Sequence, residues 1–191
     1  MKNCIIDDAV KFIESIFANN TDGHDAGHSL RVYNNAMRIA EKYPDCDKTV
    51  ISLAALLHDA DDHKLFNTVN NANARRFLKE HDVGQDITEK ICGVINSVSF
   101  SKNKDRSPDT IEGKIVQDSD RLDAIGAIGI ARTFAFGGKT GRTIGSTLNH
   151  FNEKLLLLKD KMNTEEAKSI AAERHQFMEA FLDEIKKEMG M

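Results

Sequence analysis

Residues 50–64 read VISLAALLHDADDHK, and this stretch decides the fold class. Its first eight residues are apolar except for Ser52, which predicts a helix buried on all sides rather than an amphipathic one. The apolar run ends in an acidic cluster that begins with His58 and Asp59. A buried carboxylate is costly unless it is paired or binds a metal. We therefore expect a core helix that ends at these two side chains, and the slightly negative carboxyl end of a helix favours a cation.

Helical periodicity extends on both sides of this stretch. The chain has only two prolines, which disfavours many short strands joined by proline-rich turns. Polar segments at 19–27 and 99–110 and the glycine-rich, basic segment FGGKTGRTIG at 136–145 are predicted to be loops. The sequence thus predicts an all-α protein. Apolar spacing predicts helices over about 6–17, 28–43, 48–58, 71–81, 86–98, 111–134, 147–160 and 164–189.

Composition narrows the class of protein. The chain has 191 residues, of which 40% are hydrophobic and 29% charged, as in an ordinary soluble globular domain. A formal net charge of −4 disfavours a non-specific nucleic-acid binder. The three cysteines form no CxxC pair, so neither a zinc ribbon nor a disulfide framework is indicated, and no apolar run is long enough to span a membrane. We expect a cytoplasmic protein with neither a nucleic-acid nor a membrane partner.

Two further residues turn the His58-Asp59 pair into a candidate metal site. For an isolated His-Asp dipeptide, the ordinary interpretation is a helix end with a solvated acid. Here His28 begins the preceding predicted helix, and Asp120 lies in a later helix within QDSDRLDAIG. Two histidines and two carboxylates make a mixed nitrogen and oxygen donor set, which suits Mn²⁺, Fe²⁺, Co²⁺, Ni²⁺, Mg²⁺ or Zn²⁺ without selecting one of them.

Five stretches of the chain resemble the HD superfamily of metal-dependent phosphohydrolases, and in particular a small bacterial subgroup that includes nucleotide pyrophosphohydrolases. The resemblance covers about residues 20–185. It implies a single HD-type domain over 1–191, with a five-helix core at about 20–135 and a C-terminal helical annex at about 145–189. The stretches are HDAGHSLRVYNNA, LAALLHDADDHKLF, SVSFSK, PDTIEGKIVQDSDRLDAIGAIGIARTFAFGG and LNHFNEKLLLLKDKMNTEEAKSIAAERHQFM.

The resemblance implies the metal ligands position by position. The first ligand histidine falls on His28 and the doublet on His58 and Asp59. The family places its last aspartate directly before a basic residue, as in Asp-Arg-Leu, which selects Asp120 over its neighbours Asp118 and Asp123. Helical geometry puts Asp123 on the same face as Asp120 and Asp118 on a different face.

Other residues near the motif are candidates for chemistry and substrate binding. Related enzymes use an acid just after the doublet for proton transfer, which implies a catalytic role for Asp62, with Lys64 beside it; the alternative is an exposed charged turn. Asp61 fits this pattern less well. The candidate substrate contacts are His24, Arg31, Asp123 and Lys154. Arg31 and Lys154 offer cations to an anionic phosphate.

The function expected from the resemblance is hydrolysis of a phosphate ester or phosphoanhydride. A nucleotide is the expected substrate class, and cleavage of a nucleoside triphosphate to a monophosphate and pyrophosphate is the specific expectation. Two alternatives stay open at this point. One is a non-catalytic nucleotide-binding or sensing domain. The other is a di-iron oxygenase, for which His63 and His81 would have to supply additional ligands.

Overall fold

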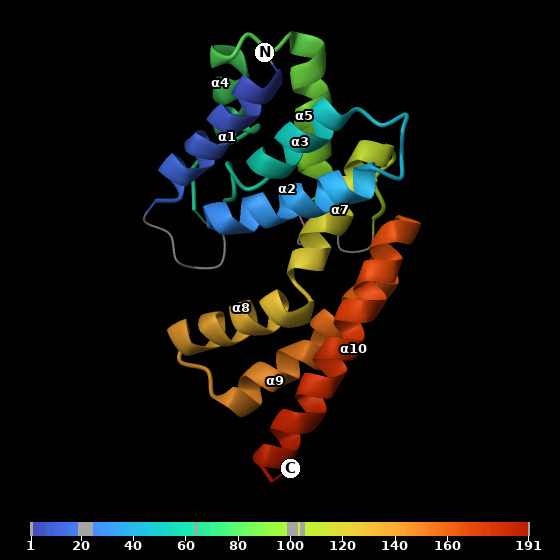
Figure 1. Ribbon diagram of the computed structural model, residues 1–191. Helices are drawn as coiled ribbons and strands as arrows, with labels where there is room; N and C mark the ends of the chain where they lie inside the picture. The colour runs from blue at the N-terminus through green and yellow to red at the C-terminus, as the bar shows by residue number, and fades with distance from the viewer. Residues whose placement is uncertain (1, 19–24, 64, 99–102, 104–105, 191) are drawn as a thin grey trace. The chain divides into compact units, whose positions relative to one another are not determined.

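The computed structural model describes residues 2–18, 25–63, 65–98, 103 and 106–190, with side chains from residue 5 onward. Every regular element within these ranges is a helix, which confirms the all-α prediction (Figure 1). The chain divides into two compact units, Met1–Ser119 (unit 1) and Asp120–Met191 (unit 2). The division falls inside the helix α7 (Ile111–Asp123). The predicted single HD-type domain, with its core and annex, stays a prediction.

Unit 1 is built around the predicted apolar helix. Residues 50–57 are buried throughout, so this helix is surrounded rather than amphipathic, as the sequence predicted. It packs against α1, α2 and α5, and α4 packs against α5 (Figure 1). None of the described helices is long and apolar enough to cross a membrane. The helices of unit 1, in addition to α7, are α1 (Lys2–Ile16), α2 (Ala26–Ala40), α3 (Lys48–Leu57), α4 (Ala72–Glu80) and α5 (Gln85–Val98).

Aspartate side chains fix where α2 and α3 begin. Asp25 accepts a hydrogen bond from the His28 backbone N–H at 2.7 Å, and so caps α2. Asp47 caps α3 by accepting from the N–H groups of Thr49 and Val50 at 2.9 and 3.1 Å. Such caps satisfy backbone donors that have no partner inside the helix. They set the positions at which the two helices enter the core.

Unit 2 contains α8 (Gly126–Lys139), α9 (Ile144–Glu153), the 3₁₀ segment η1 (Leu155–Lys161) and α10 (Glu165–Glu188). Within this unit, α10 packs against α8 and η1, and α9 packs against α8 and η1. Rings of Phe134, Phe151 and Phe181 meet with centroids 5.8–6.4 Å apart. These contacts give unit 2 an apolar core of its own.

Three boundaries in the second half of the chain differ from the predictions. The predicted helix over 111–134 is broken, because Gly126 has a φ of +74°, a conformation that glycine adopts without strain. The predicted loop at 136–145 is only a short turn, since α8 continues through Gly137. A Cβ at Gly137 would lie 2.5 Å from Thr147 Oγ1, so glycine there permits close packing of α8 on α9. The predicted helix over 147–160 is divided into α9 and η1.

Candidate metal centre

Three predicted ligand side chains converge at the carboxyl end of α3. His58 is the C-cap residue of α3, Asp59 follows it, and His28 lies in the first turn of α2. The Nε2 atoms of His28 and His58 are 3.2 Å apart. The Asp59 carboxylate places Oδ2 at 3.5 Å from His28 Nε2 and Oδ1 at 3.5 Å from His58 Nε2. The three side chains are 2%, 4% and 12% exposed for His28, His58 and Asp59, so the group is nearly closed to solvent.

A backbone hydrogen bond prepares His58 to act as a ligand. Its Nδ1 lies 2.8 Å from the carbonyl oxygen of Ala55. A carbonyl only accepts, so Nδ1 carries the hydrogen and donates it, which in the neutral ring leaves Nε2 without a hydrogen and with its lone pair. Histidines that bind metals commonly hold their other ring nitrogen in this way. The His58 lone pair therefore points toward His28 and Asp59, and the donor set fits a divalent cation.

Asp120, on α7, is the fourth predicted ligand. One of its carboxylate oxygens and one ring nitrogen from each of His28 and His58 lie within 4.8 Å of one another. Asp59 is not a member of this group of three, although its carboxylate lies at 3.5 Å from both histidines. His28, His58 and Asp120 could thus hold a metal ion.

The neighbouring aspartates of α7 have different surroundings. Asp123 is 2% exposed, and its Oδ2 accepts a hydrogen bond from Arg132 Nη1 at 2.5 Å. Asp118 is completely buried, whereas Asp120 is only partly buried. Sequence reasoning missed the Arg132 pair, because it joins residues on two helices separated by the break at Gly126. The role of Asp123 as a substrate contact stays a prediction, and its carboxylate already has a cationic partner.

The predicted catalytic segment directly follows His58 and Asp59, two of the predicted metal ligands. The Asp62 side chain is 17% exposed, and its Oδ1 lies 3.8 Å from His63 Nδ1. Its backbone is fixed on both sides, because its N–H donates to the Asp59 carbonyl at 3.1 Å and its own carbonyl accepts from Phe66 at 2.8 Å. Lys64 and His24 lie outside the described residues. The catalytic assignment of Asp62 and Lys64 stays a prediction.

Two candidate phosphate contacts lie on described helices. Arg31 follows His28 by one turn of α2, and its guanidinium lies over the first turn, where a Cβ at Gly27 would be 3.2 Å from Nη1. Lys154 ends α9 in unit 2. Burial lowers the pKa of His150, and the nearby charges of Lys154 and Arg142 lower it further. Burial is thus the main cause of the shift, and the cationic side chains of Lys154 and Arg142 act in the same direction.

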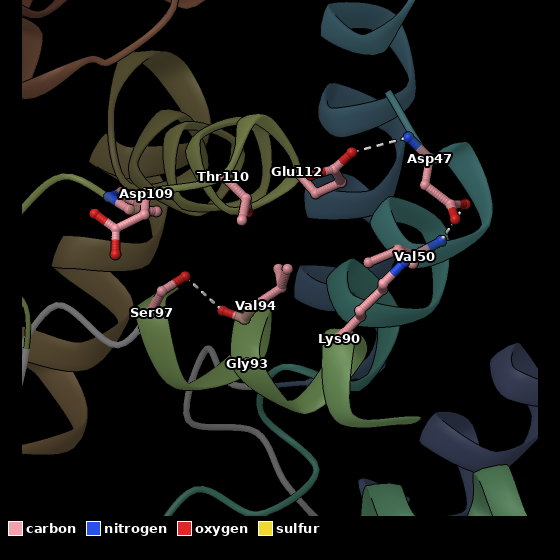
Figure 2. Close-up of a pocket in the computed structure, with 10 residues that line it drawn as sticks. Asp47, Val50, Lys90, Gly93, Val94, Ser97, Asp109, Thr110 and Glu112 are labelled. Carbon is pink, nitrogen blue, oxygen red and sulfur yellow. Dashed lines mark hydrogen bonds between the residues drawn. The ribbon is translucent and has the colours of Figure 1, made fainter. Parts of the chain in front are cut away.

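A separate cavity of about 400 Å³ lies in unit 1 at the amino end of α3 (Figure 2). None of the predicted site residues lines it. The Asp47 backbone N–H donates to Glu112 Oε1 at 2.9 Å, and Ser97 Oγ donates to the Val94 carbonyl at 2.7 Å (Figure 2). The cavity is therefore distinct from the candidate metal centre, which lies at the other end of the same helix. Its lining residues are Asp47, Val50, Lys90, Gly93, Val94, Ser97, Pro108, Asp109, Thr110 and Glu112.

Comparisons of this chain with known proteins agree on one family. A model of the HD domain matches residues 25–125, a span that includes all four predicted metal ligands. The chain is 40% identical over 186 residues to an uncharacterized protein of Bacillus subtilis strain 168, YpgQ, covering 93% of this chain and 90% of that relative.

Solved structures agree with this match. The crystal structure of Bacillus subtilis YpgQ in complex with ADP has a TM-score of 0.84 at 34% identity, covering 98% of this chain and 96% of that one. An HD-superfamily hydrolase from Bacillus thuringiensis has a TM-score of 0.82 at 38% identity, covering 100% of this chain and 99% of that one. Both similarities extend over both compact units, and so beyond the span that the HD model matches.

Proposed function

The chain belongs to the HD domain family, and we propose that it is a metal-dependent phosphohydrolase that acts on a nucleotide in the cytoplasm. The observation that carries the proposal is the meeting of His28, His58 and Asp59 at the buried end of α3, with nitrogen and oxygen donors 3.2–3.5 Å apart. A mixed set of this kind suits Mn²⁺, Fe²⁺, Co²⁺, Ni²⁺, Mg²⁺ or Zn²⁺. We propose His28, His58, Asp59 and Asp120 as the ligands.

The residues of the chain have separate tasks in this proposal. When bound, a divalent ion supplies Lewis acidity, which polarises a phosphoryl oxygen and lowers the pKa of a water molecule. The Asp62 carboxylate accepts a proton from the attacking water as a general base. Arg31 and Lys64 stabilise the charge that develops on the phosphate, and Lys154 contributes to substrate binding.

A nucleotide is the proposed substrate class. YpgQ, whose similarity covers 98% of this chain, was crystallised in complex with ADP. That ligand supports recognition of a nucleotide carrying more than one phosphate. The specific proposal is cleavage of a nucleoside triphosphate to the monophosphate and pyrophosphate. His24 and Asp123 remain proposed substrate contacts.

The di-iron alternative finds less support in the surroundings of the two other candidate histidines. His81 Nδ1 donates to the Phe77 carbonyl at 2.8 Å, and His81 Nε2 lies 3.6 Å from Asp8. The His63 side chain is 66% exposed. Neither histidine belongs to the group of potential ligand atoms found among the described residues. A second iron would need ligands from elsewhere.

The test is a screen of nucleotides with metal-reconstituted protein and chromatographic analysis of the products. We expect a monophosphate and pyrophosphate in equal amounts from a nucleoside triphosphate. The control is Asp59→Ala, which should lose bound metal and activity together. Release of inorganic phosphate alone would replace pyrophosphohydrolysis by phosphatase activity. Nucleotide binding with no turnover under any of the six metals would refute the enzyme and favour the sensing function.

A further inference from the structure

Helix α4 begins without a cap from its own N-cap residue. Asn71 occupies that position with φ 54° and ψ 45°, and its side chain makes no capping hydrogen bond. The Asn71 amide instead donates to Asn96 Oδ1 at 3.1 Å. The first N–H groups of a helix have no partner inside it, so those of α4 need an acceptor from elsewhere in the chain.

Asp61 supplies this acceptor from ten residues upstream of Asn71. The Asn73 backbone N–H donates to Asp61 Oδ1 at 2.9 Å, and the Ala74 N–H donates to Oδ2 at 3.0 Å. The Asn73 side chain returns a third bond by donating from Nδ2 to the Ala60 carbonyl at 2.8 Å. A carboxylate at a helix amino end is also favoured by the helix dipole. These three hydrogen bonds fix residues 60–61 to the first turn of α4.

Residues 60 and 61 lie between Asp59 and Asp62, two residues of the proposed chemistry. Asp59 and Asp62 are also joined to each other, because the Asp62 N–H donates to the Asp59 carbonyl at 3.1 Å. Both Asp61 oxygens are engaged with α4, so the carboxylate is committed to holding the segment. We propose that Asp61 is a positioning residue that fixes segment 59–62 against α4, and so sets the directions of the Asp59 and Asp62 carboxylates. The inference rests on the proposed function for the roles of these two residues.

The chain offers a matched control for this role. Asp47 caps α3 with two hydrogen bonds of similar length, at the end of α3 away from His58. Removing either cap, in Asp61→Ala or Asp47→Ala, should lower the melting temperature by about 2–4 °C. Only Asp61→Ala should also weaken Mn²⁺ binding, by about 10–100-fold, the usual effect of losing a group that orients a metal ligand. Asp61→Asn should recover part of the loss, because its amide oxygen still accepts one hydrogen bond.

Two measurements test whether Asp61 is a positioning residue. Calorimetric titration of metal-free protein with Mn²⁺ gives the affinity without any substrate. Steady-state kinetics at saturating Mn²⁺ should show a lower kcat with an unchanged KM in Asp61→Ala, and wild-type kinetics in Asp47→Ala. If Asp61→Ala matches Asp47→Ala in both Mn²⁺ affinity and kcat, Asp61 is only a helix cap and the proposal is overturned.

The two proposals can fail separately. If the wild-type protein binds Mn²⁺ but hydrolyses no phosphate compound, the proposed function fails, and the Mn²⁺ affinities of the variants alone decide the role of Asp61. If Asp61→Ala does not fold, Asp61→Asn replaces it, compared with Asp47→Asn. An Asn variant at 61 that binds Mn²⁺ as tightly as the one at 47, with equal kcat, then overturns the proposal.

Discussion

Replacing each of the three aspartates of α7 by alanine should separate metal binding from stability. Asp120 offers a potential ligand atom within 4.8 Å of those of His28 and His58. Asp123 is paired with Arg132 at 2.5 Å, and Asp118 is completely buried. We therefore expect Asp120→Ala to lose the metal, and Asp118→Ala and Asp123→Ala to keep it.

The magnitudes follow from these surroundings. Loss of a group that only orients a ligand costs about 10–100-fold in metal affinity, so loss of the Asp120 ligand should cost at least about 100-fold. Asp123→Ala removes the carboxylate that pairs with Arg132. Removing one partner of a fully buried pair costs about 3–5 kcal/mol, but the Arg132 side chain is 25% exposed, so about 2 kcal/mol is expected. For a chain of this size, that lowers the melting temperature by about 4–8 °C.

The assay is metal titration calorimetry and thermal unfolding of the three variants in one buffer, with unfolding measured on the metal-free proteins. Asp123→Ala should also weaken substrate binding or turnover if it is a substrate contact. The reasoning is refuted if Asp118→Ala abolishes metal binding while Asp120→Ala binds normally. The ligand assignment on α7 must then move by two residues.

Two further predictions concern a proton acceptor and a titrating histidine. Asp62→Asn should keep the metal and the fold but lower kcat by about 10²–10⁴-fold, the usual effect of losing a general base, and unchanged turnover in steady-state kinetics would leave Asp62 a surface acid. The pKa of His150 is lowered in the folded protein by burial, Lys154 and Arg142, so the unfolded chain binds its proton first as the pH falls. The stability contribution of neutral His150 is present above the ordinary pKa of about 6.5 and is lost as the pH falls from there toward the lowered folded value. Chemical denaturation at pH 7.5 and pH 5 should therefore show a smaller loss of stability in His150→Gln than in the wild type, and equal losses would contradict the shift.

The sequence by itself determined the helical class and supplied the candidate metal ligands. The apolar run at 50–57 predicted a helix buried on all sides, because Ser52 is its only polar residue and leaves no polar face. The His58-Asp59 pair at its end was identifiable because polar side chains directly after such a run must lie at the edge of the core. His28 and Asp120 were added as candidates from their places in neighbouring predicted helices, and the resemblance to a family selected them; their potential ligand atoms and that of His58 lie within 4.8 Å of one another.

Tertiary structure alone decided the contacts that join distant segments. The break before α8 depends on the positive φ of Gly126, and the passage of α8 through Gly137 depends on close packing against Thr147. The capping of α4 by Asp61 and the pairing of Asp123 with Arg132 join residues from different helices or loops. Periodicity reports which side of one helix is apolar, and so it records burial within a few turns of chain. It contains no information about which distant donor meets which acceptor, because that choice is made only when the helices pack.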